Sequence, residues 1–426
     1  MTVNPCRLCA PLGAVLVFKG FRGMMPLLHG SQGCATYIRR YLISHFREPV
    51  DVASSSFTEE TAIFGGEAQL LKALKNVKAR YNPAAVGIAS TCLSETIGDD
   101  VELFIKELEK EALPLVTVST PSYRGSHAEG FRDTAAAVLK RFLGITGEGG
   151  GRRVLLLPGI LSPADLRHLK ELTRSFGLEP VLAPDYSDTL DGGNWDTYHA
   201  LSPGGTSLKI LGSMERRDSW ISFSAGGELT PAGRIAGNVM GEKGYSLGYP
   251  TGVEAMDAFI AALRDIADTA VPGEIESERS RMLDSYADFH KYLAGLRIAV
   301  IADRDLADGI LRFLGETGAS VSFAAAPDSL PEYKDVPAYG EVDYDRIDLL
   351  LEAHPTDLIL GSSKAYPLVR GKNIPLVRIG FPVHDRVGGA RILHVGYRGS
   401  HQLLDRIVNA LLEHRQTESP VGYAYQ

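Results

Sequence analysis

The chain has 426 residues, a formal net charge of -8 at pH 7 and 44% hydrophobic residues, a composition typical of globular proteins. Its length predicts two or three domains rather than one. The acidic balance argues against a nucleic-acid partner, and no apolar run approaches the roughly 18 residues of a membrane helix. Because the N-terminal MTVNPCRLCAPLG lacks a basic region followed by an apolar stretch, we expect a cytoplasmic protein.

Several short apolar runs are each followed by a helical pattern, which predicts strand-helix units on parallel sheets. The runs VLLL and IAVI have the continuous branched character of strands buried on both faces. We therefore expect an α/β fold. The predicted strands lie in residues 84–91, 152–159, 297–305 and 357–363.

Composition shifts divide the chain into three expected domains. A glycine run at 144–153 ends the first, and a charged helical stretch at 273–295 leads into the third. Segments rich in glycine near 231–244 are interpreted as loops. The expected domains cover residues 1–150, 151–290 and 291–426.

The chain has four cysteines, and none of them lies beyond position 92. A disulfide framework would leave the last three quarters of the chain without a crosslink, so the spacing argues against that interpretation. A structural zinc site is also disfavoured, because the pair Cys6 and Cys9 is followed only by the single cysteines Cys34 and Cys92.

Iron-sulfur ligation and plain burial both remain open for these cysteines. Clusters normally use four thiolates, so a partner chain would have to supply the ligands that are lacking here. Cysteine is also often a small buried apolar residue. The glycine-rich flanks favour ligation, since Gly13, Gly30, Gly33 and Gly98 allow tight turns and close backbone approach.

Two polar groups follow predicted strands directly. Cys92 comes after the strand ending in Ala89-Ser90-Thr91, and Ser122 comes after LPLVTVST. In parallel sheets ligands bind beyond the carboxyl ends of the strands. Cys92 and Ser122 therefore occupy positions suited to chemistry.

Other polar motifs have simpler structural interpretations. Arg47 and Glu48 are more readily a structural ion pair than a catalytic one. The segment SSSFTEE, with Ser56 or Thr58 as the cap, and the pair Asp99-Asp100 are typical helix starts. No HExxH metal motif and no GxxxxGK[ST] phosphate loop is present.

Several motifs together give the chain a resemblance to a known family. The chain resembles the beta-type subunit of nitrogenase component 1 over nearly its full length, most specifically in its N-terminal third. The motifs that carry the resemblance are CAPLGA, PLLHGSQGCATYIRRYLISHFREPVDVASSSFTEETAIFGG, STCLSETIGDD, TPSYRGSH, IPLVRIGFPVHDR and GYRGS.

The resemblance implies three Rossmann-like domains with doubly wound parallel sheets. It also implies a homologous alpha-type partner in an alpha2beta2 heterotetramer and an eight-iron seven-sulfur P-cluster at the boundary between the two kinds of subunit. A larger catalytic iron-sulfur cofactor is expected in the alpha-type chain. An ATP-dependent 4Fe-4S reductase protein is expected as the electron donor.

By motif match, the resemblance also assigns roles to residues. Cys9, Cys34 and Cys92 would be the P-cluster thiolates, and Ser122 would supply a hydroxyl that joins one iron as the oxidation state changes, with Tyr37 and Ser31 close by. Phe64 matches the position where the reductase protein docks. Arg47 and Glu48 match a region near the contact between beta subunits.

Some features depart from the family pattern. Cys6 has no counterpart in the usual motif, and a spare thiol, an alternative ligand and a packed side chain are all open for it. The chain keeps all three cysteines and the serine, which favours a catalytic complex over a cofactor-maturation scaffold. Because IRRYLISHFREPVDVASSS is unlike vanadium and iron-only beta subunits, we expect a nitrogenase-like reductase of the methylthio-alkane reductase type. Dinitrogen reduction is the alternative activity.

Overall fold

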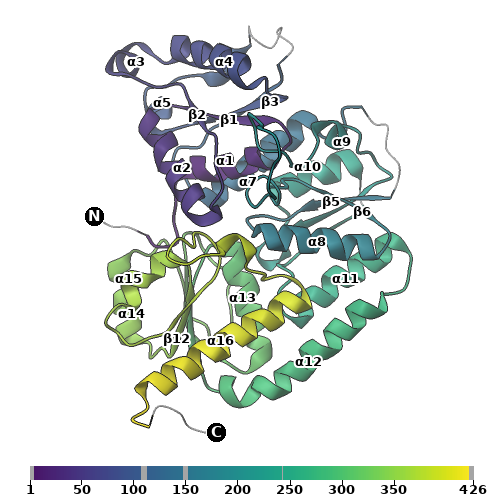
Figure 1. The fold of residues 1–426 in the computed structure, drawn as a ribbon, viewed down its shortest axis with the longest axis vertical. Helices are drawn as coiled ribbons and strands as arrows, with labels where there is room; N and C mark the ends of the chain where they lie inside the picture. Colours follow the sequence, from purple (N-terminus) through teal and green to yellow (C-terminus); the bar gives the residue numbers. More distant parts are fainter. Residues whose placement is uncertain (1–3, 107–112, 147–151, 242, 422–426) are drawn as a thin grey trace.

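Three parallel β-sheets form the framework of the computed structural model, which describes residues 4–106, 113–146, 152–241 and 243–421. Each sheet is built from consecutive stretches of the chain, and Figure 1 shows the three sheets grouped around a shared centre. This arrangement confirms the expected α/β class with parallel sheets. No helix in these described ranges is long and apolar enough to cross a membrane.

The first sheet has the order β2-β1-β3-β4. Strands β1 and β3 are buried along their whole length, as expected for strands covered on both faces. The elements of this part are β1 (Met24–His29), β2 (Ala53–Ser54), β3 (Ala85–Ser90), β4 (Leu115–Val118), α1 (Ala10–Lys19), α2 (Gln32–Phe46), α3 (Glu59–Phe64), α4 (Glu67–Tyr81), α5 (Cys92–Thr96), α6 (Val101–Ile105) and α7 (His127–Phe142).

The second sheet has the order β6-β5-β7-β8. Its elements are β5 (Arg153–Leu157), β6 (Glu179–Leu182), β7 (Ser219–Phe223), β8 (Gly244–Leu247), α8 (Pro163–Ser175), α9 (Leu208–Gly212), the 3-10 turn η2 (Ala225–Gly227), α10 (Pro231–Met240), α11 (Val253–Ala267) and α12 (Gly273–Leu293).

The third sheet has the order β11-β10-β9-β12-β13. Its elements are β9 (Arg297–Ile301), β10 (Ser320–Ala326), β11 (Ala338–Gly340), β12 (Leu358–Gly361), β13 (Leu376–Arg378), α13 (Arg304–Thr317), α14 (Tyr344–Ala353), α15 (Tyr366–Val369), α16 (Gly396–Glu418) and the 3-10 turns η3 (Ser363–Ala365) and η4 (Gly389–Arg391). Helices α12 and α16 pack against each other along one side of the molecule (Figure 1).

The expectation of loops near residues 231–244 is wrong for residues 231–240, which form α10. Thr230 caps this helix by accepting a hydrogen bond from the backbone N–H of Gly233, and Pro231 occupies the first turn. The small residues that resemble a loop lie on the face that packs on the second sheet. Ala232, Gly233 and Ala236 are buried, and a Cβ atom at Gly233 would lie 3.3 Å from the side chain of Ser222 in β7.

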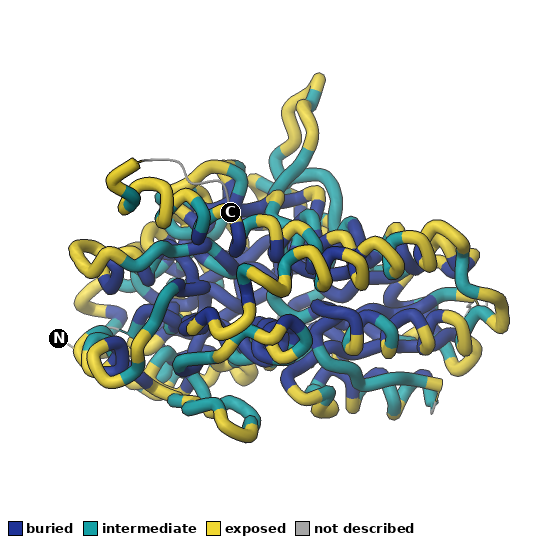
Figure 2. The backbone as a smooth tube through the Cα atoms, turned by 90° about the horizontal axis from the view of Figure 1, so that it is seen from below, coloured by how far each residue is buried: buried dark blue, intermediate teal, exposed yellow. Residues whose placement is uncertain are grey.

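One apolar core joins the three sheets. Its largest cluster of buried side chains runs from Leu8 through the second sheet to Leu411, and Figure 2 shows the buried backbone filling the interior. The domain limits 1–150, 151–290 and 291–426 stay a prediction. Residues 147–151 of the glycine run that suggests the first limit lie outside the described residues.

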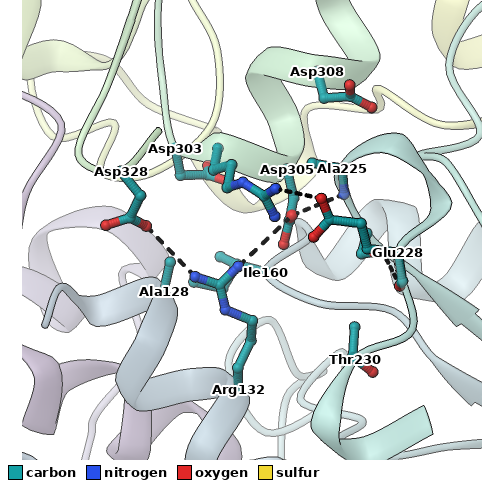
Figure 3. Close-up of polar contacts among 12 residues, drawn as sticks. Ala128, Arg132, Ile160, Ala225, Glu228, Thr230, Asp303, Asp305, Asp308 and Asp328 are labelled. Atoms are coloured by element: carbon teal, nitrogen blue, oxygen red, sulfur yellow. Dashed lines mark hydrogen bonds and ion pairs between the residues drawn. The ribbon is translucent and has the colours of Figure 1, made fainter. Parts of the chain in front are cut away.

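A polar junction also connects the three parts (Figure 3). Arg132, on α7, lies 3.5 Å from the carboxylate of Asp328 and 4.0 Å from that of Asp305. The same Asp305 accepts a hydrogen bond from the backbone N–H of Ala225. Burial raises the pKa of neighbouring Asp303 to about 7. The junction therefore gathers several carboxylates around few cations.

Candidate functional site

The carboxyl edge of the first sheet holds most of the residues singled out in the sequence. Strand β1 ends before Ser31 and Cys34, β3 ends before Cys92, and β4 ends before Ser122. Because the strands are parallel, these loops emerge at one edge. Topology thus brings together residues that are up to 91 positions apart, counted from Ser31 to Ser122.

Cys9 reaches this edge from the N-terminal side of α1. It is half-buried at the N-cap position and forms an isolated antiparallel bridge with Ser126, in the loop after β4. The guanidinium of Arg7 donates to the carbonyl of Ser122 at 2.7 Å. These contacts attach the Cys9 segment to the loop that carries Ser122.

Close packing of α1 on α7 explains the glycine in CAPLGA. A Cβ atom at Gly13 would lie 1.9 Å from the carbonyl oxygen of His127, and one at Gly130 would lie 2.1 Å from that of Ala10. Neither position has room for a larger side chain. The two glycines let α1 approach the backbone of α7 and so determine the position of Cys9.

Cys34 lies in the first turn of α2, where its thiol is half-buried. The Oγ of Ser31, the N-cap residue, lies 3.7 Å from the Sγ of Cys34 and donates to it. Tyr37 follows one turn later and packs against Tyr41, with ring centroids 4.7 Å apart and the ring planes tilted by 52°. Burial raises the pKa of Tyr37, and the charges of Tyr41 and Cys9 add to this effect.

Cys92 is the first residue of α5 and is exposed. Its sulfur accepts a hydrogen bond from the backbone N–H of Ser122 at 3.2 Å. Glu95, one turn later, accepts from the hydroxyl of Ser119 at 2.6 Å. The loop after β4 is therefore held against α5 at two points.

The three thiols interact electrostatically, which shows that the fold gathers them. Burial raises the pKa of Cys9 to about 11, and the charges of Cys34 and Cys92 contribute to this rise. Lys364, in η3, lies close enough to Cys6 and Cys9 to interact with their charges. Burial lowers the pKa of Lys364, whereas the charges of Cys6 and Cys9 raise it. The positively charged side chain of Lys364 therefore lies near Cys6 and Cys9, two thiols whose ionisation is disfavoured by burial.

All four cysteines are free thiols. In the described part of the chain, no three His, Cys, Asp or Glu side chains are placed to hold a single metal ion. The three thiols at the sheet edge are thus neighbours that do not converge on one point. A centre of several metal atoms, each bound by a different thiolate, suits this arrangement better than a mononuclear site.

Cys6 is a packed side chain. It is buried with Ile301, Phe323 and Leu368 in a cluster on the third sheet, and its thiol donates to the carbonyl of Ala325 at 3.5 Å. Burial raises its pKa far above the usual range. Of the three interpretations left open by the sequence, the structure supports packing.

Phe64 ends α3 and is 85% exposed, with its neighbour Ile63 also exposed. Thr58 caps this helix, as one of the two expected candidates. Arg47 does not form the expected ion pair with Glu48; its guanidinium donates to the carbonyl of His384 at 3.3 Å. Burial and the charge of Asp191 raise the pKa of Glu48.

The pair Asp99-Asp100 precedes a helix start, as predicted: Asp100 caps α6 by accepting from the backbone N–H of Leu103, whereas Asp99 has other partners. The Asp99 carboxylate lies 3.0 Å from Nε2 of the buried His29. Sequence patterns also did not single out Arg7, Glu95 or Lys364. Only the position of Glu95, one turn after Cys92, offered a local signal.

Comparison with known proteins places this geometry in a family. The model of the family described as nitrogenase component 1 type oxidoreductase matches residues 9–412. The nitrogenase molybdenum-iron protein beta chain of Frankia alni is 32% identical, covering 99% of this chain and 84% of its own length. The corresponding chain of Clostridium pasteurianum is 31% identical, with 98% and 95% covered.

A biosynthetic protein and two solved structures are also similar. The nitrogenase iron-molybdenum cofactor biosynthesis protein NifN of Nostoc sp. is 32% identical over 97% of this chain and 94% of its own. A chain of nitrogenase Cp1 at pH 6.5 superimposes with a TM-score of 0.92 at 30% identity, covering 100% and 97% of the two chains. A chain of nitrogenase Cp1 at pH 5, 16% identical with a TM-score of 0.73, shares the fold. The chain therefore belongs to the nitrogenase component 1 type oxidoreductase family, as a beta-type subunit.

Proposed function

We propose that this chain is the beta-type subunit of a nitrogenase-like reductase, in which Cys9, Cys34 and Cys92 hold an eight-iron seven-sulfur P-cluster shared with an alpha-type subunit. When bound, the cluster supplies one-electron chemistry between an ATP-dependent 4Fe-4S reductase protein and a catalytic iron-sulfur cofactor in the alpha-type chain. The observation that carries the proposal is the gathering of three free thiols and Ser122 at one sheet edge.

The donor set fits such a cluster. Thiolates are the usual ligands of iron-sulfur centres, and a cluster binds them in the deprotonated form. Burial and mutual repulsion raise the pKa of Cys9, so the apo-protein does not favour its thiolate. Positive iron offsets both effects. Cys92 and part of Cys34 remain accessible, which leaves room for ligands from a second chain.

Two hydrogen bonds adjust the electron density on the sulfurs. The hydroxyl of Ser31 donates to Cys34, and the backbone N–H of Ser122 donates to Cys92. Donors of this kind stabilise the reduced state, because they withdraw charge from the thiolate. The hydroxyl of Ser122 has the opposite effect when it binds iron, since a hard oxygen donor favours the oxidised state.

The exposed end of α3 supports the assignment of a docking surface for the reductase protein. Ile63 and Phe64 are 75% and 85% exposed and adjacent, although such side chains are usually buried. Glu59 and Glu60 begin the same short helix. An aromatic side chain beside charged ones is a common composition for a contact with a partner.

For the substrate, we propose small organic sulfides, whose carbon-sulfur bond would be cleaved reductively, as in methylthio-alkane reductases. This proposal is supported by the sequence of residues 38–56, which is unlike that of vanadium and iron-only beta subunits. Dinitrogen reduction is compatible with the same ligands. A maturation scaffold has specific support as well, because NifN of Nostoc sp. is as similar in sequence as the catalytic beta chains.

Anaerobic co-purification with the alpha-type chain tests the proposal. The measurement is iron per alpha/beta pair, together with paramagnetic resonance spectra of the reduced and oxidised states. About eight irons attributable to the interface support the relay, and only four would support the scaffold. Protein without iron would contradict the assignment of the ligands. Assays with an organic sulfide and with dinitrogen then separate the two substrates.

A further inference from the structure

A chain of buried polar contacts lies between the cysteine-bearing loops and the exposed end of α3. His29, the last residue of β1, is fully buried, and its Nε2 lies 3.0 Å from the carboxylate of Asp99. The Nδ1 atom of His29 lies 3.1 Å from the hydroxyl of Ser55. The ring of Phe57 packs edge-on against the imidazole at 4.8 Å. Both imidazole nitrogens therefore have a partner.

One end of this chain meets the segment that follows Phe64. Both carboxylate oxygens of Asp99 accept from the backbone N–H of Gly66, at 3.1 Å each. Gly66 caps the start of α4, and Gly65 before it has a φ of +93° that favours glycine. A Cβ atom at Gly66 would lie 2.4 Å from Asp99. The turn between α3 and α4 is thus fitted closely around this carboxylate.

The other end meets the loops that carry Cys34 and Cys92. The hydroxyl of Ser55 accepts from the backbone N–H of Gly30, the residue before Ser31, at 2.9 Å. The side chain of Thr91, which precedes Cys92, donates to the carbonyl of His29 at 3.0 Å. A Cβ atom at Gly30 would lie 2.1 Å from Thr91. The loops that carry Cys34 and Cys92 therefore pack on each other beside His29, the residue that contacts Asp99.

We propose that Asp99 is a positioning residue that couples the exposed end of α3 to the loops carrying Cys34 and Cys92. This inference rests on the proposed function, because it makes a contact at Phe64 alter the surroundings of the thiols. A displacement of α3 reaches Gly66, is transmitted by the carboxylate to His29, and passes through Ser55 to Gly30. From Gly66 onwards, each contact of this route, through Asp99, His29 and Ser55 to Gly30, is a hydrogen bond inside the protein.

A carboxylate is suited to this position because it accepts from two sides at once. With the proton of His29 on Nε2, an assignment made from the hydrogen-bond pattern, Asp99 accepts from both His29 and Gly66. Nδ1 then accepts from Ser55, which in turn accepts from Gly30. An asparagine has nearly the same size but only one accepting oxygen. Asp99→Asn therefore removes the negative charge that strengthens the hydrogen bonds from His29 and Gly66, and one of the two oxygens that accept from Gly66, while it keeps the packing.

The test uses the complete alpha/beta complex with its reductase protein. The neighbouring Asp100→Asn is the matched control, since that exposed side chain caps α6 and contacts neither His29 nor Gly66. Hydrogen exchange of residues 30–36 is measured with and without the reductase protein, and the rate of the first electron transfer is measured by rapid mixing. Iron content and reductase affinity are measured in parallel.

In the wild type and in Asp100→Asn, we expect reductase binding to change exchange in residues 30–36. In Asp99→Asn, we expect this response to disappear and the electron-transfer rate to fall about tenfold, with iron content and affinity unchanged. A wild-type response and rate in Asp99→Asn would overturn the inference. Wild-type protein without iron would instead overturn the proposed function.

A second variant keeps the test decisive if Asp99→Asn cannot be purified. Ser55→Ala removes the hydroxyl between His29 and Gly30 and leaves the contact of Asp99 with Gly66 intact. We expect the same loss of response and rate. Retention of both by Ser55→Ala would overturn the route through Ser55 on which the inference depends.

Discussion

The backbone N–H of Ser122 donates to the sulfur of Cys92 across 3.2 Å, and the Ser122 hydroxyl takes no part in this contact. One residue thus offers two separable groups to the site. Removal of the side chain leaves the N–H in place. A substitution can therefore distinguish the contribution of the hydroxyl from that of the backbone.

We predict that Ser122→Ala retains the full iron content and shifts the redox behaviour of the P-cluster. The remaining N–H keeps Cys92 in position, whereas the loss of a hard oxygen donor makes the most oxidised state less favourable. A redox titration followed by paramagnetic resonance measures the shift. Ser119→Ala is the control, because that hydroxyl contacts Glu95 and not Cys92. A titration identical to that of the wild type would count against the role of Ser122.

Replacement of a proposed ligand cysteine and replacement of the packed cysteine should have different effects on iron content and stability. Cys34→Ala should lose the interfacial iron, since it removes a proposed ligand. Cys6→Ala should keep the iron and lower the free energy of unfolding by about 1 kcal/mol, because it empties a small volume in the core of the third sheet. Iron analysis and denaturant unfolding check the pair. Iron loss in Cys6→Ala would mean that its packing is not its only role.

Phe64→Ala should weaken docking of the reductase protein without weakening the fold. The side chain is 85% exposed, so the expected change in the free energy of unfolding is within about 0.5 kcal/mol. If Phe64 anchors the contact, the dissociation constant should rise by about tenfold or more. Val387→Ala, at a position 82% exposed after β13, is the control. Equal binding by the two variants would remove Phe64 from the docking surface.

Stability should fall on acidification through buried neutral histidines. Burial lowers the pKa of His45 to about 3, and its Nδ1 accepts from the backbone N–H of Val383 at 2.8 Å. In the unfolded chain the imidazole returns to its ordinary pKa near 6.5, so unfolding takes up a proton below that pH. The stabilisation is complete above about pH 6.5 and is lost progressively towards pH 3, by about 2 kcal/mol at pH 5.

His45→Asn tests this dependence, because the amide oxygen replaces Nδ1 as acceptor and does not titrate in this range. Unfolding of this variant should be less sensitive to pH between 5 and 7, by up to about 1.4 kcal/mol per pH unit. His199→Asn, at an exposed position, is the control. An unchanged slope in His45→Asn would show that other groups cause the acid sensitivity.

Local sequence patterns predicted the structure correctly where all the residues that determine an element lie in one segment. The predicted strands correspond to β3, β5, β9 and β12, and the charged stretch after residue 272 forms α12. Thr58 caps α3 as one of its two candidates. In each case the pattern reflects burial on both faces, helical periodicity or capping, which depend on neighbours within a few residues.

Local patterns failed where distant contacts decide. Two consecutive aspartates begin α6, yet only Asp100 caps it, because His29 and Gly66 bind Asp99 from other elements. The apparent loop at residues 231–240 is the helix α10, whose small residues are buried against the second sheet. The sulfur of Cys6 contacts Ala325, 319 residues away, and no pattern near Cys6 specifies that contact.

The position of Cys6 also has a consequence for the order of events during synthesis. Its pocket on the third sheet is formed by residues between 299 and 369, which the ribosome makes long after the N-terminal segment. Only two residues separate Cys6 from Cys9, so the first thiol of the site is anchored by the sheet that is made last. We therefore expect the N-terminal segment to take its final position late, and insertion of the proposed cluster to follow translation of the third sheet.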